Sequence, residues 1–182
     1  MYQKGFTLIE MLVAVSIFAI VMVVSVGTLV VLVTSSGVTQ RIQSLTTNLS
    51  FATDMMTRDI RTGHGYYCTD SIGGTLPTGT QDCADGGDGI VFTNSETDDR
   101  TAYRFNSTDD SLEIRIESGS WIRITSPEVT VEDAQFFVTG STRGDSVQPQ
   151  VRVVLRGVPT DDSLPVSTFY LQSTLTQRIV DF

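Results

Sequence analysis

The sequence predicts an α+β protein in which one long N-terminal helix packs on an antiparallel β-sheet domain. Three observations support this fold class. Residues 6–33 are apolar except for a single charged residue, Glu10. Apolar residues then recur at steps of three and four as far as Ile60, which is typical of one face of a helix. The second half of the chain consists of short segments that alternate apolar and polar residues between turn-forming residues.

The apolar run at residues 6–33 is long enough to cross a bilayer, which takes about 20 predominantly apolar residues. A secretory signal peptide has a shorter apolar core, of about 7 to 15 residues, and ends in a small-residue cleavage site that is not found here. Lys4 predicts that the short N-terminal side stays in the cytoplasm. Glu10 is then an ionisable group inside the membrane, which makes it a functional candidate by default.

The helix is predicted to continue beyond the membrane, from about Thr7 to Arg61. Gly63 and Gly65 then favour its end. We therefore divide this part into a membrane half at residues 6–35 and an amphipathic half at residues 36–62, whose polar face suits water or a polar neighbour. The apolar face is expected to comprise Val38, Ile42, Leu45, Leu49, Ala52, Met56 and Ile60.

Residues 63–88 are rich in Gly, Thr and Asp and are predicted to form an irregular connector loop. Its two cysteines, Cys68 and Cys83, stand 15 positions apart. In an exported domain, an isolated even pair of this kind indicates a disulfide. A metal site is the alternative, although two thiols and the single histidine of the chain, His64, make a poor set of zinc ligands.

An antiparallel β domain is predicted at residues 89–182. The alternation is clearest around Leu112, where Glu113 and Arg115 separate apolar neighbours, and around Val153. Short polar turns between the segments indicate antiparallel hairpins. Seven strands are expected, at residues 89–93, 100–105, 111–117, 120–125, 129–138, 150–155 and 168–179.

Composition excludes some classes of function. The formal net charge is −9, and it lies almost entirely beyond the membrane run because Lys4 and Glu10 cancel. Such an acidic domain repels nucleic acid, so nucleic-acid binding is not expected as its main role. Five aromatic residues of the second half lack the basic neighbours of a base-stacking platform and are expected to be core or packing residues. These five are Trp121, Phe136, Phe137, Phe169 and Tyr170.

Few residues suggest bound metal or catalysis. Asp82, Asp85 and Asp88 lie on a glycine-rich turn and carry the oxygen ligands that calcium prefers, so they are a calcium candidate. The alternative is a solvated acidic turn, because the EF-hand pattern is absent. The chain has no nucleophile elbow, phosphate-binding loop, HExxH or CxxC motif. We therefore expect no enzyme activity and no cofactor.

The run Lys4-Gly5-Phe6-Thr7-Leu8-Ile9-Glu10, followed by a long helix of Val, Ile, Ala and Leu, resembles the amino-terminus of the type IV pilin and pseudopilin superfamily. The resemblance covers about the first 30 residues. It implies a basic leader at residues 1–5, which a prepilin peptidase removes between Gly5 and Phe6, and N-methylation of Phe6. It also implies that Glu10 of an incoming subunit meets the N-terminal amine of its neighbour and sets the axial register.

The resemblance further implies a pilin-like lollipop that acts as a structural subunit, a minor pilin or minor pseudopilin of a type IV pilus or a type II secretion pseudopilus. The implied partners are other pilin or pseudopilin subunits, the prepilin peptidase and an inner-membrane assembly platform. The implied location is a single pass of the cytoplasmic membrane with the C-terminal domain outside, and then an extracytoplasmic filament.

Shorter motifs at residues 55–61, 129–138 and 168–178 resemble the J-type minor pseudopilins of type II secretion and related minor pilins. Two other classes of function remain open. One is an exposed binding module for adhesion or DNA uptake that is carried on a pilin stem. The other is a membrane-anchored enzyme, which would need a pocket with converging carboxylates.

Overall fold

The computed structural model of the chain describes residues 5–144, 147–160 and 168–178. It divides into two compact units, residues 1–41 and residues 42–182, and helix α1 (Leu8–Thr62) contributes to both. In the first unit, every side chain from Phe6 to Ser36 is exposed. Among the residues that the structure describes, this part of α1 therefore packs none of its apolar surface against another segment.

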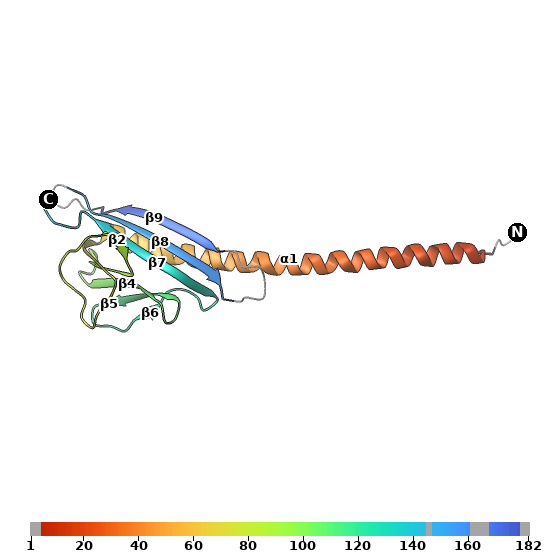
Figure 1. Cartoon of the computed structure of the whole chain (residues 1–182), viewed down its shortest axis with the longest axis horizontal. Helices are drawn as coiled ribbons and strands as arrows, with labels where there is room; N and C mark the ends of the chain where they lie inside the picture. Colours follow the sequence, from red (N-terminus) through yellow and green to blue (C-terminus); the bar gives the residue numbers. More distant parts are fainter. Residues whose placement is uncertain (1–4, 145–146, 161–167, 179–182) are drawn as a thin grey trace. The chain divides into compact units, whose positions relative to one another are not determined.

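The second unit combines the C-terminal part of α1 with two antiparallel sheets (Figure 1). The five-stranded sheet has the order β1-β3-β4-β5-β6, and the four-stranded sheet has the order β2-β7-β8-β9. Nine strands lie within the described residues: β1 (His64–Thr69), β2 (Cys83–Gly87), β3 (Gly89–Thr93), β4 (Arg100–Asn106), β5 (Ser111–Ile116), β6 (Ile122–Arg123), β7 (Val129–Thr139), β8 (Gln150–Pro159) and β9 (Phe169–Thr176).

One face of α1 belongs to the same apolar core as both sheets. Leu49 of this face packs on β8, where a Cβ added at Gly157 would lie 2.9 Å from a Leu49 methyl group. The glycine therefore allows the close approach of helix and sheet. The buried face comprises Leu45, Leu49, Ala52, Thr53, Met56 and Ile60. It begins later than predicted, because Val38 is only half-buried and Ile42 is 37% exposed.

The helix ends within one residue of the predicted position because its last carbonyl groups find partners outside the helix. The Tyr66 hydroxyl donates to the carbonyl oxygen of Ile60 (2.7 Å), and the Ser95 hydroxyl donates to that of Thr62. A Cβ at Gly63 would lie 2.4 Å from the Phe92 ring. Only glycine therefore lets the chain turn from the helix into β1 at this place.

The prediction of an irregular connector at residues 63–88 was wrong at both of its ends. Residues 64–69 form β1, which pairs with β3, and residues 83–87 form β2, which pairs with β7 through an irregular register. Neither strand shows a clear alternation, and each depends on a partner that lies later in the chain. At residues 120–125 a full strand was predicted, but only Ile122 and Arg123 form one.

The outer face of the five-stranded sheet is the face opposite the shared core. Glu113 and Arg115, which alternate with apolar residues in β5, lie on this face, and both side chains are buried. Segment 70–80, which we call the strap, supplies carbonyl oxygens to this face. Arg115 donates to Gly73 O (3.3 Å), and Arg100 of β4 donates to Pro77 O.

A small apolar cluster completes this outer layer. Leu76 of the strap packs with Val91 and Ala102 of the sheet, and Trp121 packs at the edge of the cluster. The guanidinium of Arg104 lies 4.0 Å from the centre of the Trp121 ring. The strap and these stacked side chains together shield the sheet face from water.

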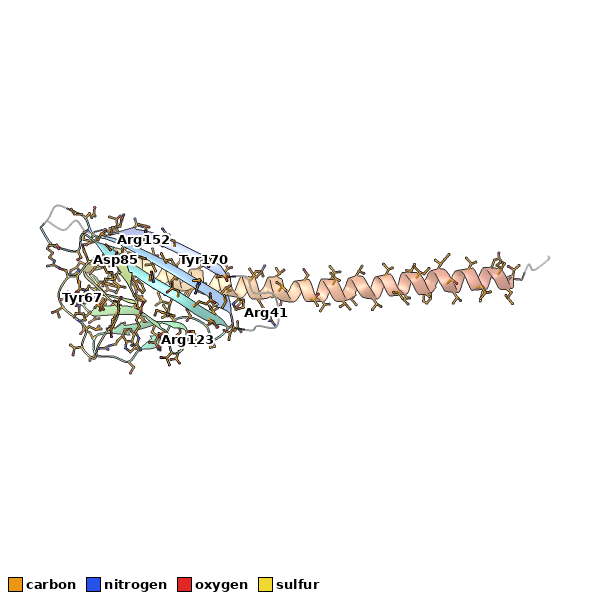
Figure 2. The ribbon with its side chains drawn as sticks, viewed as in Figure 1. Arg41, Tyr67, Asp85, Arg123, Arg152 and Tyr170 are labelled. Atoms are coloured by element: carbon orange, nitrogen blue, oxygen red, sulfur yellow. A yellow bond between two sulfur atoms is a disulfide. The ribbon has the colours of Figure 1, made fainter. Side chains whose placement is uncertain are left out.

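Two aromatic predictions have different outcomes. Phe136 is fully buried in the shared core, as expected. Tyr170 was expected to pack inside, but its side chain is 67% exposed on the solvent side of β9 (Figure 2). The reason is the strand period, because the neighbouring residues Phe169 and Leu171 take the inward positions.

Candidate processing and assembly site

The candidate site begins where the chain enters α1. Thr7 precedes the first helical residue, and Glu10 lies three positions later. The Glu10 carboxylate accepts the backbone N–H of Thr7 (2.9 Å) and its hydroxyl proton (2.8 Å). The Thr7 hydroxyl oxygen in turn lies 3.3 Å from the N–H of Glu10. This reciprocal arrangement is a capping box, which satisfies helix N–H groups that have no partner within the helix.

The predicted cleavage bond lies immediately before this capping box. Gly5 and Phe6 are both exposed, and the Phe6 side chain is 83% exposed. A Cβ placed on Gly5 would meet no other atom within 4 Å. None of the described residues therefore covers the Gly5–Phe6 bond, which fits access by a processing enzyme.

Helix α1 is long enough and apolar enough to cross a membrane, judged by length and composition. Its hydroxyl side chains do not disturb the apolar surface, because they bond back to the helix backbone. Ser16 donates to Leu12 O (2.8 Å), and Ser25 donates to Val21 O (2.7 Å). Glu10 is therefore the one charged side chain in an otherwise apolar helix surface from Phe6 to Val33.

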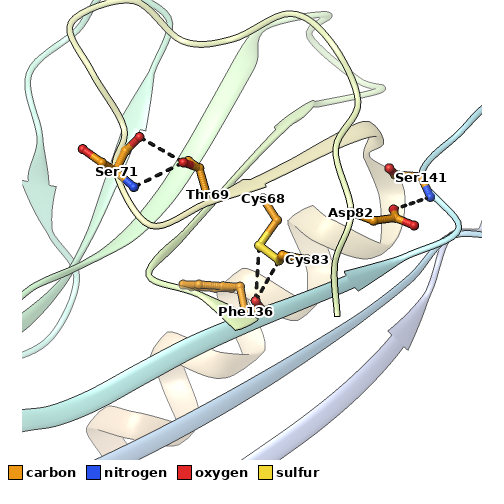
Figure 3. The surroundings of a disulfide bond; sticks show 7 residues. All are labelled: Cys68, Thr69, Ser71, Asp82, Cys83, Phe136 and Ser141. Atoms are coloured by element: carbon orange, nitrogen blue, oxygen red, sulfur yellow. Dashed lines mark hydrogen bonds between the residues drawn. A yellow bond between two sulfur atoms is a disulfide. The ribbon is translucent and has the colours of Figure 1, made fainter. Parts of the chain in front are cut away.

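The predicted disulfide is present between Cys68 and Cys83, with the two Cα atoms 5.7 Å apart (Figure 3). It joins β1 of the five-stranded sheet to β2 of the four-stranded sheet, and both sulfur atoms lie near the carbonyl oxygen of Phe136. The strap lies between the two cysteines in the chain. The disulfide therefore fixes both ends of the strap and links the two sheets covalently.

The structure does not bring the calcium candidates Asp82, Asp85 and Asp88 together. Within the described residues, no three His, Cys, Asp or Glu side chains form a group that could hold a metal ion. Asp82 instead accepts the backbone N–H groups of Gly140 (3.0 Å) and Ser141 (2.9 Å). Burial raises the pKa of Asp82, but these bonds from Ser141 and Gly140 outweigh burial and lower the pKa below its usual value.

Two carboxylates, those of Asp70 and Asp88, line a cavity of about 100 Å³ next to Arg104. Burial raises the pKa of Asp88, and the charges of Asp70 and Asp133 raise it further. A raised carboxyl pKa is a feature of some catalytic acids. The cavity is smaller than the roughly 300–1,000 Å³ of typical ligand pockets, which favours a structural role for the two carboxylates over a catalytic one.

Three residues that contribute to the contacts described above were not identified from the sequence: Thr7, Arg100 and Arg115. The spacing Thr-x-x-Glu is the signal of a capping box and would have identified Thr7. Arg100 and Arg115 gave no comparable signal, because their carbonyl partners lie far away in the sequence. His64 is the first residue of β1, where its Nδ1 lies 3.3 Å from the Ser95 hydroxyl oxygen, and Ser95 in turn donates to the last carbonyl oxygen of α1.

Comparison with known proteins identifies one feature of this chain. Residues 1–26 match the family described as the prokaryotic N-terminal methylation motif. None of the curated proteins matches the chain. No solved structure matches it either. The matched residues contain Gly5, Phe6, Thr7 and Glu10, and the match therefore supports a type IV pilin-like chain whose N-terminus is a prepilin substrate.

Proposed function

We propose that this chain is a structural subunit of a membrane-rooted filament, assembled through α1 after removal of residues 1–5 and N-methylation of Phe6. The observation that carries the proposal is the methylation motif at residues 1–26, which coincides with a helix surface that packs against no other described residue of its own chain. In this proposal the chain first spans the cytoplasmic membrane once, with residues 42–182 outside. Its partners are other pilin-type subunits, the prepilin peptidase and an assembly platform.

Glu10 is the proposed assembly residue. A carboxylate in an apolar environment is costly unless it has a charged or hydrogen-bonding partner. Thr7 supplies part of that partnership within the chain. Cleavage at Gly5 creates an ammonium group on Phe6, and the ammonium of a neighbouring subunit would neutralise Glu10. The pairing then fixes the axial position of one subunit relative to the next.

Two substitutions at one position separate the capping role of Glu10 from its charge. Glu10→Gln keeps a side chain that fits the capping box but removes the charge, whereas Glu10→Val removes both. We expect both variants to be inserted and cleaved, and both to be depleted from filaments at least tenfold. The measurement compares the chain in sheared filaments with the chain in membranes. Normal assembly of Glu10→Gln would show that capping, and not charge pairing, is what Glu10 contributes.

Processing is tested directly by mass spectrometry of the native protein. The mature chain is expected to begin at Phe6 and to carry one methyl group on its amine. A chain that still begins at Met1, in a host with an active prepilin peptidase, would contradict the proposal.

We further propose the finer assignment to a J-type minor pseudopilin of type II secretion, which the motifs at residues 55–61, 129–138 and 168–178 support. Phe136 of the second motif is buried in the shared core, so this motif has a structural role in the fold. The genes next to this one provide the test. A complete type II secretion cluster would support the assignment, and a cluster for a type IV pilus or for DNA uptake would contradict it.

A further inference from the structure

The two sheets differ in how they protect their edges. An unpaired edge strand presents free backbone N–H and C=O groups, and proteins usually blunt such edges with bulges, short strands or charges. β6 is only two residues long, and β2 is short and irregular in register. β1 is irregular too, and Gln81 bonds to its outer edge through Tyr66 O and the N–H of Cys68.

The fourth edge, β9, has none of these devices. Phe169–Thr176 contains no charged residue and no proline, and its pairing with β8 continues through all eight residues without a bulge. Within the described residues, no other strand pairs with its second side. Among the four sheet edges, β9 is therefore the one that is open to pairing with an added strand.

The register shows which backbone groups are free. The Gln177 N–H donates to Pro149 O (3.1 Å), and hydrogen-bonded pairs alternate along an antiparallel ladder. With the register that runs from Gln150↔Thr176 to Gly157↔Phe169, the backbone N–H and C=O groups of the odd-numbered residues of β9 therefore point toward β8. The even-numbered residues direct their N–H and C=O groups to the open side. They are Tyr170, Gln172, Thr174 and Thr176.

A basic groove of about 380 Å³ lies at the C-terminal end of this edge. It is lined by one flank of α1 and by Arg178, whose N–H donates to Arg61 O (3.0 Å). The opposite flank of α1 faces the five-stranded sheet, where the Tyr103 hydroxyl donates to the Asp59 carboxylate (2.6 Å). Arg178 lies two residues after the end of β9, so the groove adjoins the C-terminal end of this edge although no residue of β9 itself lines it.

Three guanidinium groups face this groove, from Arg58, Arg61 and Arg178, against the single carboxylate of Asp54. Within residues 5–144, 147–160 and 168–178, none of the three side chains forms a hydrogen bond or ion pair. Arginine binds carboxylates through two parallel hydrogen bonds. On a chain with a net charge of −9, this local positive charge selects for a carboxylate.

We propose that the β9 edge accepts an extended segment of a partner protein and that a carboxylate of this segment binds Arg58, Arg61 and Arg178. Backbone hydrogen bonds to the even-numbered residues of β9 would supply affinity, and the arginines would supply specificity. The partner is a different protein, because a second copy of this chain would bring a net charge of −9 against an equally acidic chain.

The experiment uses the full chain in detergent micelles and two synthetic fluorescent decapeptides. Both peptides have a core of six alternating Thr and Val residues. One carries two Glu at each end and the other two Lys at each end, so that the direction of pairing does not matter. Fluorescence anisotropy measures the dissociation constants, and we expect the Glu peptide to bind at least tenfold more tightly than the Lys peptide.

Matched variants test each half of the site. Thr174→Pro removes an N–H that points to the open side, and Thr174→Ala keeps it. We expect only the proline variant to lose binding of the Glu peptide, by at least tenfold. Arg61→Gln, which leaves the strand intact, should weaken the Glu peptide and leave the Lys peptide unchanged. Far-ultraviolet circular dichroism checks that each variant is folded.

Three results would overturn the proposal. One is equal binding of the two peptides by the wild-type chain. Another is equal binding of the Glu peptide by Thr174→Pro and Thr174→Ala when both are folded. The third is a concentration-dependent dimer of the chain that Thr174→Pro abolishes, because it would make a second copy of the chain the occupant of the edge.

Discussion

The inner core and the outer layer of the five-stranded sheet are built on different principles. The inner core is an apolar cluster between α1 and both sheets, and its residues follow the helix and strand periods of the sequence. The outer layer buries only three apolar residues, Leu76, Val91 and Ala102, within the described chain. Its other contacts are arginine bonds to strap carbonyls and a disulfide at the strap ends. The inner core thus depends on apolar residues that follow the helix and strand periods, whereas the outer layer depends largely on polar contacts between residues far apart in the sequence.

The largest effect is expected in the inner core. Leu49 is fully buried on α1, and Leu49→Ala leaves a cavity against β8. We expect a loss of about 2 to 5 kcal/mol in the free energy of unfolding. Denaturation of the full chain in micelles, followed by the fluorescence of Trp121, measures it. Leu29→Ala, at a side chain that is 61% exposed, is the control and should leave the transition unchanged.

Among the contacts of the outer layer, the disulfide is expected to contribute most to the free energy of unfolding. Replacing Cys68 and Cys83 together by Ser removes a cross-link over 15 positions, for which chain entropy gives about 3 kcal/mol. Because the two ends of the strap are then no longer cross-linked to each other, we also expect limited proteolysis to cleave first within residues 70–80. Cleavage that starts in another loop would show that the arginine bonds hold the strap without the disulfide.

Two arginines that lie over aromatic rings, Arg115 in the outer layer and Arg152 in the four-stranded sheet, are expected to contribute differently to stability. Arg115 is buried and donates to Gly73 O and to Glu117 O (3.2 Å), so Arg115→Ala leaves carbonyl groups without partners. We expect a loss of about 1 to 3 kcal/mol in unfolding free energy. Arg152 lies 4.0 Å from the Phe137 ring centre but is exposed, and Arg152→Ala should cost about 1 kcal/mol or less. Equal losses in the two variants would contradict the proposed role of the strap.

The smallest effects concern two carboxylates with opposite pKa shifts. The lowered pKa of Asp82 means that it stabilises the fold above its unfolded pKa of about 3.9, and that this contribution is lost as pH falls through the folded pKa. The raised pKa of Asp88 has the opposite sign, so its charge destabilises the fold as pH rises above about 3.9.

The corresponding amides test these signs. At pH 7, Asp82→Asn should lower the free energy of unfolding and Asp88→Asn should raise it, each by less than about 1 kcal/mol because both groups are largely solvated. Both differences should shrink when the denaturation curves are repeated at pH 3.5. A difference that persists at pH 3.5 would indicate a packing effect instead of a charge effect.

The contrast between the two regions also explains what the sequence could predict. The C-terminal end of α1 and the bounds of β3 followed from local signals, namely the glycines after Thr62 and a compact apolar run. The alternation in β5 correctly placed Glu113 and Arg115 on the face opposite Leu112. It could not show that the strap covers this face, because the partners of Arg115 are single carbonyl groups about 40 residues away.

The candidate site shows the same division. Gly5, Phe6 and Glu10 are adjacent in the chain, so the motif was readable from the sequence. Arg58, Arg61 and Arg178 were not recognised as a group, since Arg178 reaches the others only when β9 closes the four-stranded sheet. The calcium candidate included Asp82, but the N–H groups that bond to its carboxylate come from Gly140 and Ser141, which follow β7 about 60 residues later in the chain.

The contact between Leu49 and Gly157 also has a consequence for biogenesis. The ribosome makes the apolar face of α1 first, and β8 and β9, which belong to the same core, come last. In the proposed topology this face is therefore uncovered until β8 and β9 have crossed the membrane. Incomplete chains with exposed apolar surface are prone to aggregate. The order of the elements therefore leads us to expect that a holding chaperone on the outer side of the membrane slows this aggregation until β9 has crossed.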